Sequence, residues 1–154
     1  MTSRCIARSS RTQRTSFLRQ HTRAVLSQTS EYALRIMTFL AQQDSDALVP
    51  AAAMDGKVSV PANYRGKILH PLTRVGLLES TRGRTGGFRL ARPASRIRLT
   101  DVVAPFEPRT DNTCLLGRAR CQDAQPCGAH ERWRVLLRTR EEFLQGTTIA
   151  DVAS

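Results

Sequence analysis

The segment LLESTRGRTGGFRLAR, residues 77–92, restricts the fold of this chain more than any other feature. Leu77 to Arg82 and Phe88 to Ala91 each have the length and composition of a short strand. Between them, Gly83 to Gly87 supplies glycines that adopt positive φ without steric cost, so the chain can reverse direction tightly. The segment therefore predicts a β-hairpin with a basic, glycine-rich tip.

Helical patterns precede this hairpin. The first begins near Ser30 and repeats its apolar residues at helical spacing, at Tyr32, Ala33, Ile36, Met37, Phe39 and Leu40. A short helix is expected over 50–57, and a second one from Pro61 to about Val75. Pro71 should kink or shorten that second helix, and Gly76 can end it in the left-handed conformation. Two short helices joined by a tight turn and followed by a hairpin are in winged-helix order.

The chain after the hairpin is expected to hold a short helix at 100–103, a loop at 104–127 and a long helix from Ala129 to Gln145. Thr148 can cap a last short turn. One side of the long helix carries Trp133, Leu136, Leu137, Arg140, Phe143 and Leu144. This side needs a partner surface, and pairing with a second copy of the chain is favoured over packing on its own domain. The predicted fold is mainly α with a small β wing, a winged helix-turn-helix plus a long C-terminal dimerisation helix.

The formal net charge of +11 favours a polyanionic partner. Residues 1–25 hold six arginines and no acidic residue, so they carry +6 of this charge and the remainder carries +5. Their composition predicts a disordered leader without the apolar core of a signal peptide. No apolar run approaches the roughly 20 residues that span a bilayer. The charge alone leaves two kinds of partner, nucleic acid or an anionic membrane surface. Our expectation is a cytoplasmic protein whose partner is nucleic acid and not a membrane.

The second short helix and the wing carry the residues suited to reading DNA. On the helix these are Asn63, Arg65, Lys67 and Arg74, and on the wing they are Arg82, Arg84 and Arg89. Asn and Arg read base edges with paired hydrogen bonds, whereas Lys mainly contacts phosphate. Gly66 has no side chain, so the helix backbone can lie close to the DNA backbone at this point. The alternative is a small α+β domain whose arginines only face solvent.

Three cysteines and a histidine lie within 17 residues, at Cys114, Cys121, Cys127 and His130. Thiolates are soft ligands for zinc, copper(I) or iron–sulfur clusters, and imidazole suits zinc and iron. The spacing lacks the C-x2-C knuckle of a zinc finger. Metal or cluster binding is favoured over the alternatives, which are a disulfide switch or inert thiols. Cys5, in the leader, has no expected role at this site.

The strings LSQTSEYALRIMTFLA (26–41) and VPANYRGKILHPLTRVGLLESTRGRTGGFRLARPASRIRLTDVV (60–103) resemble the IscR/NsrR family of Rrf-type winged-helix regulators. The resemblance extends from Leu26 to Val152 and includes the cysteine segment. It implies DNA contacts at Asn63, Gly66, Lys67 and Arg82, with Arg84 on the same wing. Arg65 departs from the family pattern, which usually has an inward leucine there.

The resemblance also implies an iron–sulfur cluster on Cys114, Cys121 and Cys127. His130 matches the histidine of IscR-like members, which favours a 2Fe-2S over a 4Fe-4S cluster. The alternative fourth ligand is Glu31, which aligns with a carboxylate that some NsrR-like members donate across the dimer. Release of the cysteine loop on cluster loss or oxidation would shift the recognition helices and change operator affinity.

The implied organisation has five parts: a leader at 1–25, a DNA-binding domain at 26–104, a cluster-binding loop at 105–128, a dimerisation helix at 129–146 and a tail at 147–154. The expected function is a homodimeric regulator of double-stranded operator DNA that senses through the cluster. The alternative is a cluster-free, or zinc- or thiol-based, winged-helix repressor. An enzyme is not expected, because the chain has no phosphate loop, no G-x-S-x-G and no usefully spaced carboxylate pair.

Removing residues 1–25 should leave the fold and sequence-specific DNA binding intact. Binding to random DNA should weaken in a salt-dependent way, because arginines in a disordered leader contact phosphates and do not read bases. Titration of the full chain and of a 26–154 fragment with specific and random duplexes, at two salt concentrations, measures both effects. Loss of sequence discrimination in the fragment would contradict the prediction.

Overall fold

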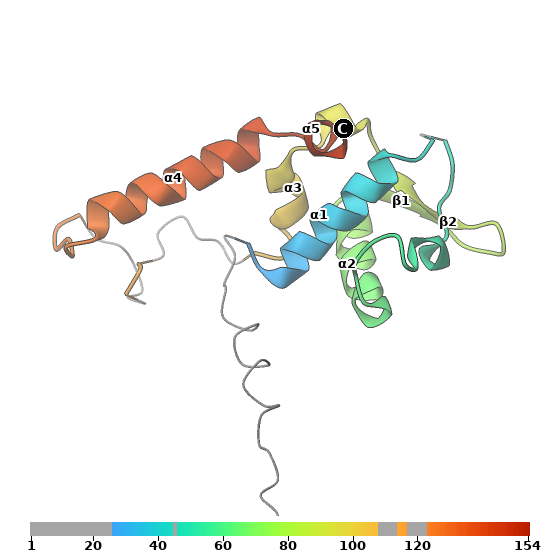
Figure 1. The fold of residues 1–154 in the computed structure, drawn as a ribbon, viewed down its shortest axis with the longest axis horizontal. Helices are drawn as coiled ribbons and strands as arrows, with labels where there is room; N and C mark the ends of the chain where they lie inside the picture. Colours follow the sequence, from blue (N-terminus) through green and yellow to red (C-terminus); the bar gives the residue numbers. More distant parts are fainter. Residues whose placement is uncertain (1–25, 45, 108–113, 117–122) are drawn as a thin grey trace, which may run out of the picture.

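A computed structural model describes residues 26–44, 46–107, 114–116 and 123–154, so the expected leader lies outside the described residues. The elements are α1 (Gln28–Ala41), η2 (Ala51–Met54), α2 (Ala62–Arg74), β1 (Leu78–Thr81), β2 (Gly87–Leu90), η3 (Ala94–Arg96), α3 (Leu99–Val103), α4 (His130–Gly146) and α5 (Ile149–Ala153). Figure 1 shows the hairpin and α4 on opposite sides of the packed helices. The mainly helical fold with a small two-stranded sheet is confirmed.

Helix α1 lies at the centre of the core. Ser27 caps it, because the Ser27 hydroxyl accepts a hydrogen bond from the backbone N–H of Ser30. The inward residues are Ala33, Ile36, Met37 and Leu40, all at most 4% exposed. These residues belong to the stripe predicted from the sequence, and they contact α2, α3, α5 and β2.

Helix α2 continues through Pro71 and ends at Arg74, so the proline does not shorten it. Gly76 then takes φ +72°, as predicted. The backbone N–H of Leu77 donates to the carbonyl of Leu72, and that of Gly76 to the carbonyl of Thr73. This pair of bonds is the Schellman pattern, and it turns the chain directly into β1.

The β1–β2 hairpin is antiparallel, with Leu78 opposite Leu90 and Thr81 opposite Gly87. A Cβ at Gly86 would lie 2.1 Å from the carbonyl oxygen of Thr81, so only glycine fits this tip. Val49 exchanges two 2.9 Å backbone hydrogen bonds with Phe88. That bridge fixes the wing to the segment just before η2.

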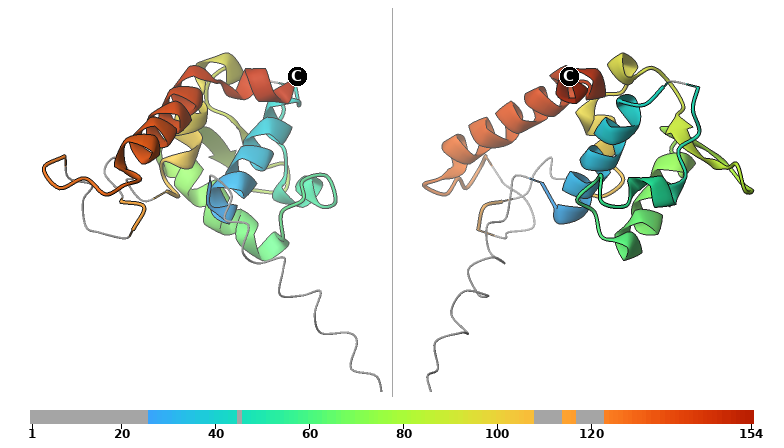
Figure 2. Two further views of the ribbon diagram at one scale, coloured as in Figure 1. Left: turned by 60° about the vertical axis from the view of Figure 1, so that its left-hand side comes forward. Right: turned by 45° about the vertical axis from the view of Figure 1, so that its right-hand side comes forward.

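Helix α4 is anchored near its C-terminal end. The backbone N–H of Leu99 donates to the carbonyl of Thr147, and Leu144 is 3% exposed. Two other large apolar residues of α4, Leu136 and Phe143, are 55% and 59% exposed. Both views in Figure 2 show α4 extending away from the other helices. Of the helices the structure describes, none is long and apolar enough to cross a membrane.

Arg65 corrects one expectation from the sequence, because it does not lie on the exposed side of α2. The residue is only 9% exposed, on the same face as Ile68 and Leu72. Its guanidinium donates to the carbonyl of Ala51 at 3.0 Å and forms an ion pair with Asp55. The Nε atom is buried without a hydrogen-bond partner among the described residues. A buried guanidinium needs such pairing, so Arg65 ties α2 to both ends of η2.

Asp55→Ala should lower the free energy of unfolding by about 1–2 kcal/mol, because it leaves the buried Arg65 charge unpaired. Arg65→Leu should change it by less than about 1 kcal/mol, since a leucine removes both the charge and the unpaired Nε. Urea denaturation followed by circular dichroism measures both values. Asp46→Ala, at an exposed acidic position, serves as the control. Equal stability of Asp55→Ala and the wild type would contradict the prediction.

Candidate nucleic-acid interface and cysteine segment

The outward face of α2 carries the residues predicted to contact DNA. Asn63, Gly66, Lys67, His70 and Arg74 are all exposed, at spacings that place them on one side of the helix. Gly66 has nothing within 4 Å of the position a Cβ would take, so the helix surface is bare at this point. The face is polar and basic, and the major groove of DNA is wide enough to admit one α-helix.

Aromatic rings support Lys67 from below. Its Nζ lies 5.6 Å from the centroid of the Tyr64 ring. Tyr64 in turn makes an edge-on contact with Tyr32 of α1, with ring centroids 5.4 Å apart. Lys67 is therefore held in an outward orientation by packing that reaches α1.

The wing presents two exposed arginines at its tip, Arg82 and Arg84. Gly83 lies between them with φ +112°, a conformation that strongly favours glycine. The turn therefore holds both arginines at the end of the hairpin, where they can reach a phosphate or a narrow minor groove.

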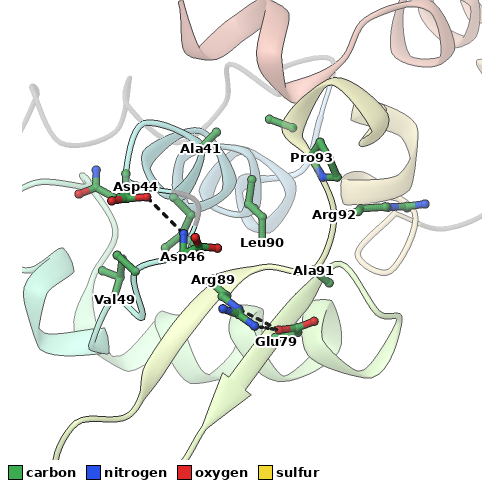
Figure 3. A pocket seen from close by; sticks show the side chains of 14 residues that line it. Ala41, Asp44, Asp46, Val49, Glu79, Arg89, Leu90, Ala91, Arg92 and Pro93 are labelled. Carbon is green, nitrogen blue, oxygen red and sulfur yellow. Dashed lines mark hydrogen bonds and ion pairs between the residues drawn. The ribbon is translucent and has the colours of Figure 1, made fainter.

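Arg89 does not join this basic tip. Its Nη2 lies 2.8 Å from Oε2 of Glu79 on the neighbouring strand. Figure 3 shows both side chains at a cavity of about 360 Å³ behind the wing, with Asp44, Asp46 and Arg92 also on its wall. Arg92 is likewise paired, at 3.2 Å from Asp101. The arginines of this cavity are neutralised, so we exclude Arg89 from the candidate DNA contacts.

The cysteine segment is described in part. Cys114 is 5% exposed and Cys127 is half-buried. Cys121 lies outside the described residues. The backbone N–H of His130 donates to the carbonyl of Cys127 at 2.9 Å, so these two residues share one turn at the start of α4. Within the part of the chain that is described, no three His, Cys, Asp or Glu side chains are grouped closely enough to hold a metal ion.

His130 is 3% exposed, and its Nε2 lies 2.9 Å from Oδ1 of Asp123. Arg134, one turn further along α4, donates to the same oxygen at 2.6 Å. The hydrogen bond to His130 and then the charge of Arg134 lower the pKa of Asp123. Asp123 therefore orients the imidazole, as carboxylates do for metal-binding histidines. Sequence reasoning missed Asp123, although an acidic residue between the cysteines and the histidine was a usable signal.

Glu31, the alternative ligand, lies in the first turn of α1, and Oε2 is 3.8 Å from Nη2 of Arg35. It is partly exposed, so its carboxylate is accessible from outside the protomer. Within this chain it stabilises the N-terminus of α1 through the helix dipole.

Glu107 was also missed, because its partners are far away in the sequence. Its Oε1 accepts hydrogen bonds from the Ser27 backbone N–H at 2.7 Å and from the Ser30 hydroxyl at 2.6 Å. Oε2 lies 3.9 Å from Nη2 of Arg140. Burial raises the pKa of Glu107, but the hydrogen bonds from Ser30 and Ser27 and the charge of Arg140 outweigh it, so the pKa is lowered overall.

Comparisons with known proteins agree with this arrangement. A family model described as "Rrf2: Iron-dependent Transcriptional regulator" matches residues 26–154. The chain is 31% identical over 127 residues to the transcriptional regulator IscR of Vibrio atlanticus, covering 82% of this chain and 73% of that protein. It is 36% identical over 132 residues to protein aau3 of Rhizobium meliloti, covering 82% and 83%. The structure of CymR, the global cysteine regulator of B. subtilis, superposes with a TM-score of 0.72 at 22% identity, covering 84% and 96%.

Proposed function

The chain belongs to the Rrf2 family of transcriptional regulators, and on that premise we propose that it binds double-stranded operator DNA as a homodimer and senses through an iron–sulfur cluster. The family match over residues 26–154 carries this proposal, together with the cysteines and histidine between Glu107 and α4. We place the protein in the cytoplasm. The expectation that it is a regulator and not an enzyme is confirmed by the names of its relatives.

The DNA contacts proposed are Asn63, Gly66 and Lys67 on α2, and Arg82 and Arg84 on the wing. All five are exposed, and the Val49–Phe88 bridge fixes the wing next to the helix-turn-helix. Asn63 and Arg82 have the chemistry to read base edges, whereas Lys67 and Arg84 supply charge for phosphates. Sequence preference should therefore depend on the first pair.

A homodimer through α4 follows from the exposure of this helix. Val135, Leu136 and Phe143 are each more than half exposed, although their side chains are large and apolar. A second α4 would cover them. Two-fold pairing would also place two copies of α2 for a palindromic site.

For the cluster, we propose Cys114, Cys121 and Cys127 as thiolate ligands and His130 as the fourth ligand. The residues present fit such a group: soft donors lie close in the sequence, and Cys114 and His130 are shielded from solvent. Asp123 holds Nε2 of His130 in the manner of a carboxylate outside the ligand shell. When bound, the cluster would supply a centre that responds to oxidants, nitric oxide or iron–sulfur supply.

Regulation would act through the position of the cysteine segment. The segment is tied to the DNA-binding core at Glu107 and to α4 at His130. A cluster bound by the thiolates and the imidazole would hold the two ends of the segment together. Loss of the cluster would remove this link between the two ends. A resulting change in the position of α4 would alter operator affinity without a change in any DNA-contacting residue.

A thiol-based regulator without a cluster is the second candidate. The three closely spaced cysteines, Cys114, Cys121 and Cys127, and the fold shared with CymR favour it. Colour separates the two candidates, because an iron–sulfur protein absorbs visible light and a thiol or zinc protein does not.

Lys67→Ala should weaken binding to all DNA sequences by a similar factor and reduce the salt slope by about one, because it removes one phosphate contact. Arg82→Ala should cost about 1–3 kcal/mol on the preferred duplex and blur sequence preference. Fluorescence anisotropy with preferred and random duplexes measures both. Arg89→Ala, the same change at the arginine paired with Glu79, should leave affinity unchanged. An equal loss for Arg82→Ala on both duplexes would make Arg82 a phosphate contact only.

Replacing Cys114, Cys121 or Cys127 with Ala should abolish visible absorption after anaerobic purification, because each thiolate fills an iron site. His130→Ala should leave a weaker, faster-bleaching cluster, since one nitrogen ligand is replaceable, and His130→Cys should stabilise it. Absorption spectra with iron and sulfide analysis measure these effects. The dimer should persist in all variants.

Cys5→Ala controls for the loss of a thiol outside the segment and should keep full absorption. Glu31→Ala should have little effect if His130 is the fourth ligand, and should destroy the cluster if the carboxylate crosses the dimer. Retention of colour, iron and regulated DNA binding after replacement of all three cysteines would overturn the cluster proposal.

A further inference from the structure

The side chain of Glu107 joins parts of the molecule that are distant in sequence. The backbone N–H groups of Phe106 and Glu107 donate to the carbonyl of Val103 at 2.9 and 3.1 Å. The turn after α3 therefore fixes the position of the Glu107 backbone. Its side chain is only 15% exposed. Glu107 is therefore a rigidly placed, largely buried carboxylate.

One oxygen of Glu107 completes the N-terminus of α1. In a capping box, the third residue of a helix supplies a carboxylate that accepts from the backbone N–H of the N-cap residue. In α1 that third residue is Ser30, which has no carboxylate, and Glu107 accepts from the Ser27 N–H in its place. The Ser30 hydroxyl, fully buried, donates to the same oxygen. These bonds fix the start of α1 to the end of α3.

The other oxygen of Glu107 faces α4, 3.9 Å from Arg140. The Arg140 side chain is 13% exposed, so solvent screens this pair less than it would an exposed pair. Arg140 precedes Thr147, where α4 is bonded to Leu99, by seven residues or about 10 Å along the helix. A helix held at one end can pivot, whereas contacts at two separated points fix its direction.

We propose that Glu107 is a positioning residue that sets the angle between α4 and the DNA-reading elements, and thereby the separation of the two recognition helices in the dimer. This inference rests on the proposed function, because it requires α4 to join two copies and α2 to enter DNA. The far end of α4, at His130, lies about 15 Å beyond Arg140, so a small change of angle is enlarged there. Two-fold readers need their recognition helices about one helical turn of DNA apart, which makes the angle decisive for spacing.

The test compares the wild-type protein with Glu107→Gln. Glutamine keeps an oxygen that can accept from Ser27 and Ser30 but loses the charge that faces Arg140. Glu142→Gln removes the same charge from an exposed position on α4 and serves as the matched control. The probe is the palindromic duplex that the wild-type protein enriches from a random pool. Its centre is also lengthened or shortened by one or two base pairs, and a single half-site is included.

We expect Glu107→Gln to bind the original palindrome about three- to tenfold more weakly, with a flatter dependence on spacing. Half-site affinity and dimer mass should match those of the wild type and of Glu142→Gln. An unchanged preference for the original spacing would overturn the proposal. So would an equal loss on every duplex including the half-site, because that result marks a general structural defect.

Failure of the proposed function is seen separately, in the wild-type protein. If the wild type is monomeric or enriches no two-fold site, the dimeric operator-binding function is wrong, and the role of Glu107 falls with it. If the wild type behaves as a dimeric reader and the Gln variant keeps its spacing preference, only the role of Glu107 is wrong.

Discussion

The inward stripe of α1 is the surface on which the rest of this protein is assembled. Ala33, Ile36 and Met37 are completely buried, and α2, α3, α5 and β2 all pack against their helix. Helix α2, the proposed recognition helix, is oriented by this contact, and so is Lys67, whose supporting Tyr64 rests on Tyr32 of α1. The geometry of the proposed DNA-facing surface thus depends on apolar burial on the opposite side of the same helices.

Helix periodicity and turn chemistry made most of this fold predictable. The inward residues of α1, the left-handed Gly76 and the hairpin tip were all readable because each depends on neighbours in the sequence. The pairing of the arginines with carboxylates was not predictable from the sequence. Arg65 lies on an apolar face because Asp55 and the Ala51 carbonyl receive its charge, and Arg89 turns towards Glu79 across the hairpin. Composition counts such charges, but only tertiary structure shows which of them are neutralised.

The candidate sites also contain some features that could be predicted from the sequence and others that could not. The exposed residues of α2 and the wing could be named from the sequence, since a helix face and a hairpin tip follow from local pattern. The spacing of Cys114, Cys127 and His130 could also be seen, but their surroundings could not. Asp123 orients His130, and Glu107 reaches residues 77 and 80 positions away; such pairings follow from packing alone.

The contact between α1 and α5 has a consequence for how the chain acquires its structure. α1 is formed by residues 28–41, and α5, which covers it, by residues 149–153. The N-terminus of α1 also depends on Glu107, which accepts the hydrogen bond from the Ser27 N–H and lies 80 residues later in the chain. During synthesis α1 therefore leaves the ribosome long before α5, so the part of its apolar stripe that α5 covers stays exposed until residues 149–153 have been made. A chain that ends before α5 lacks this part of the cover, and we expect chaperones and proteases to recognise it more readily than the chain that includes α5.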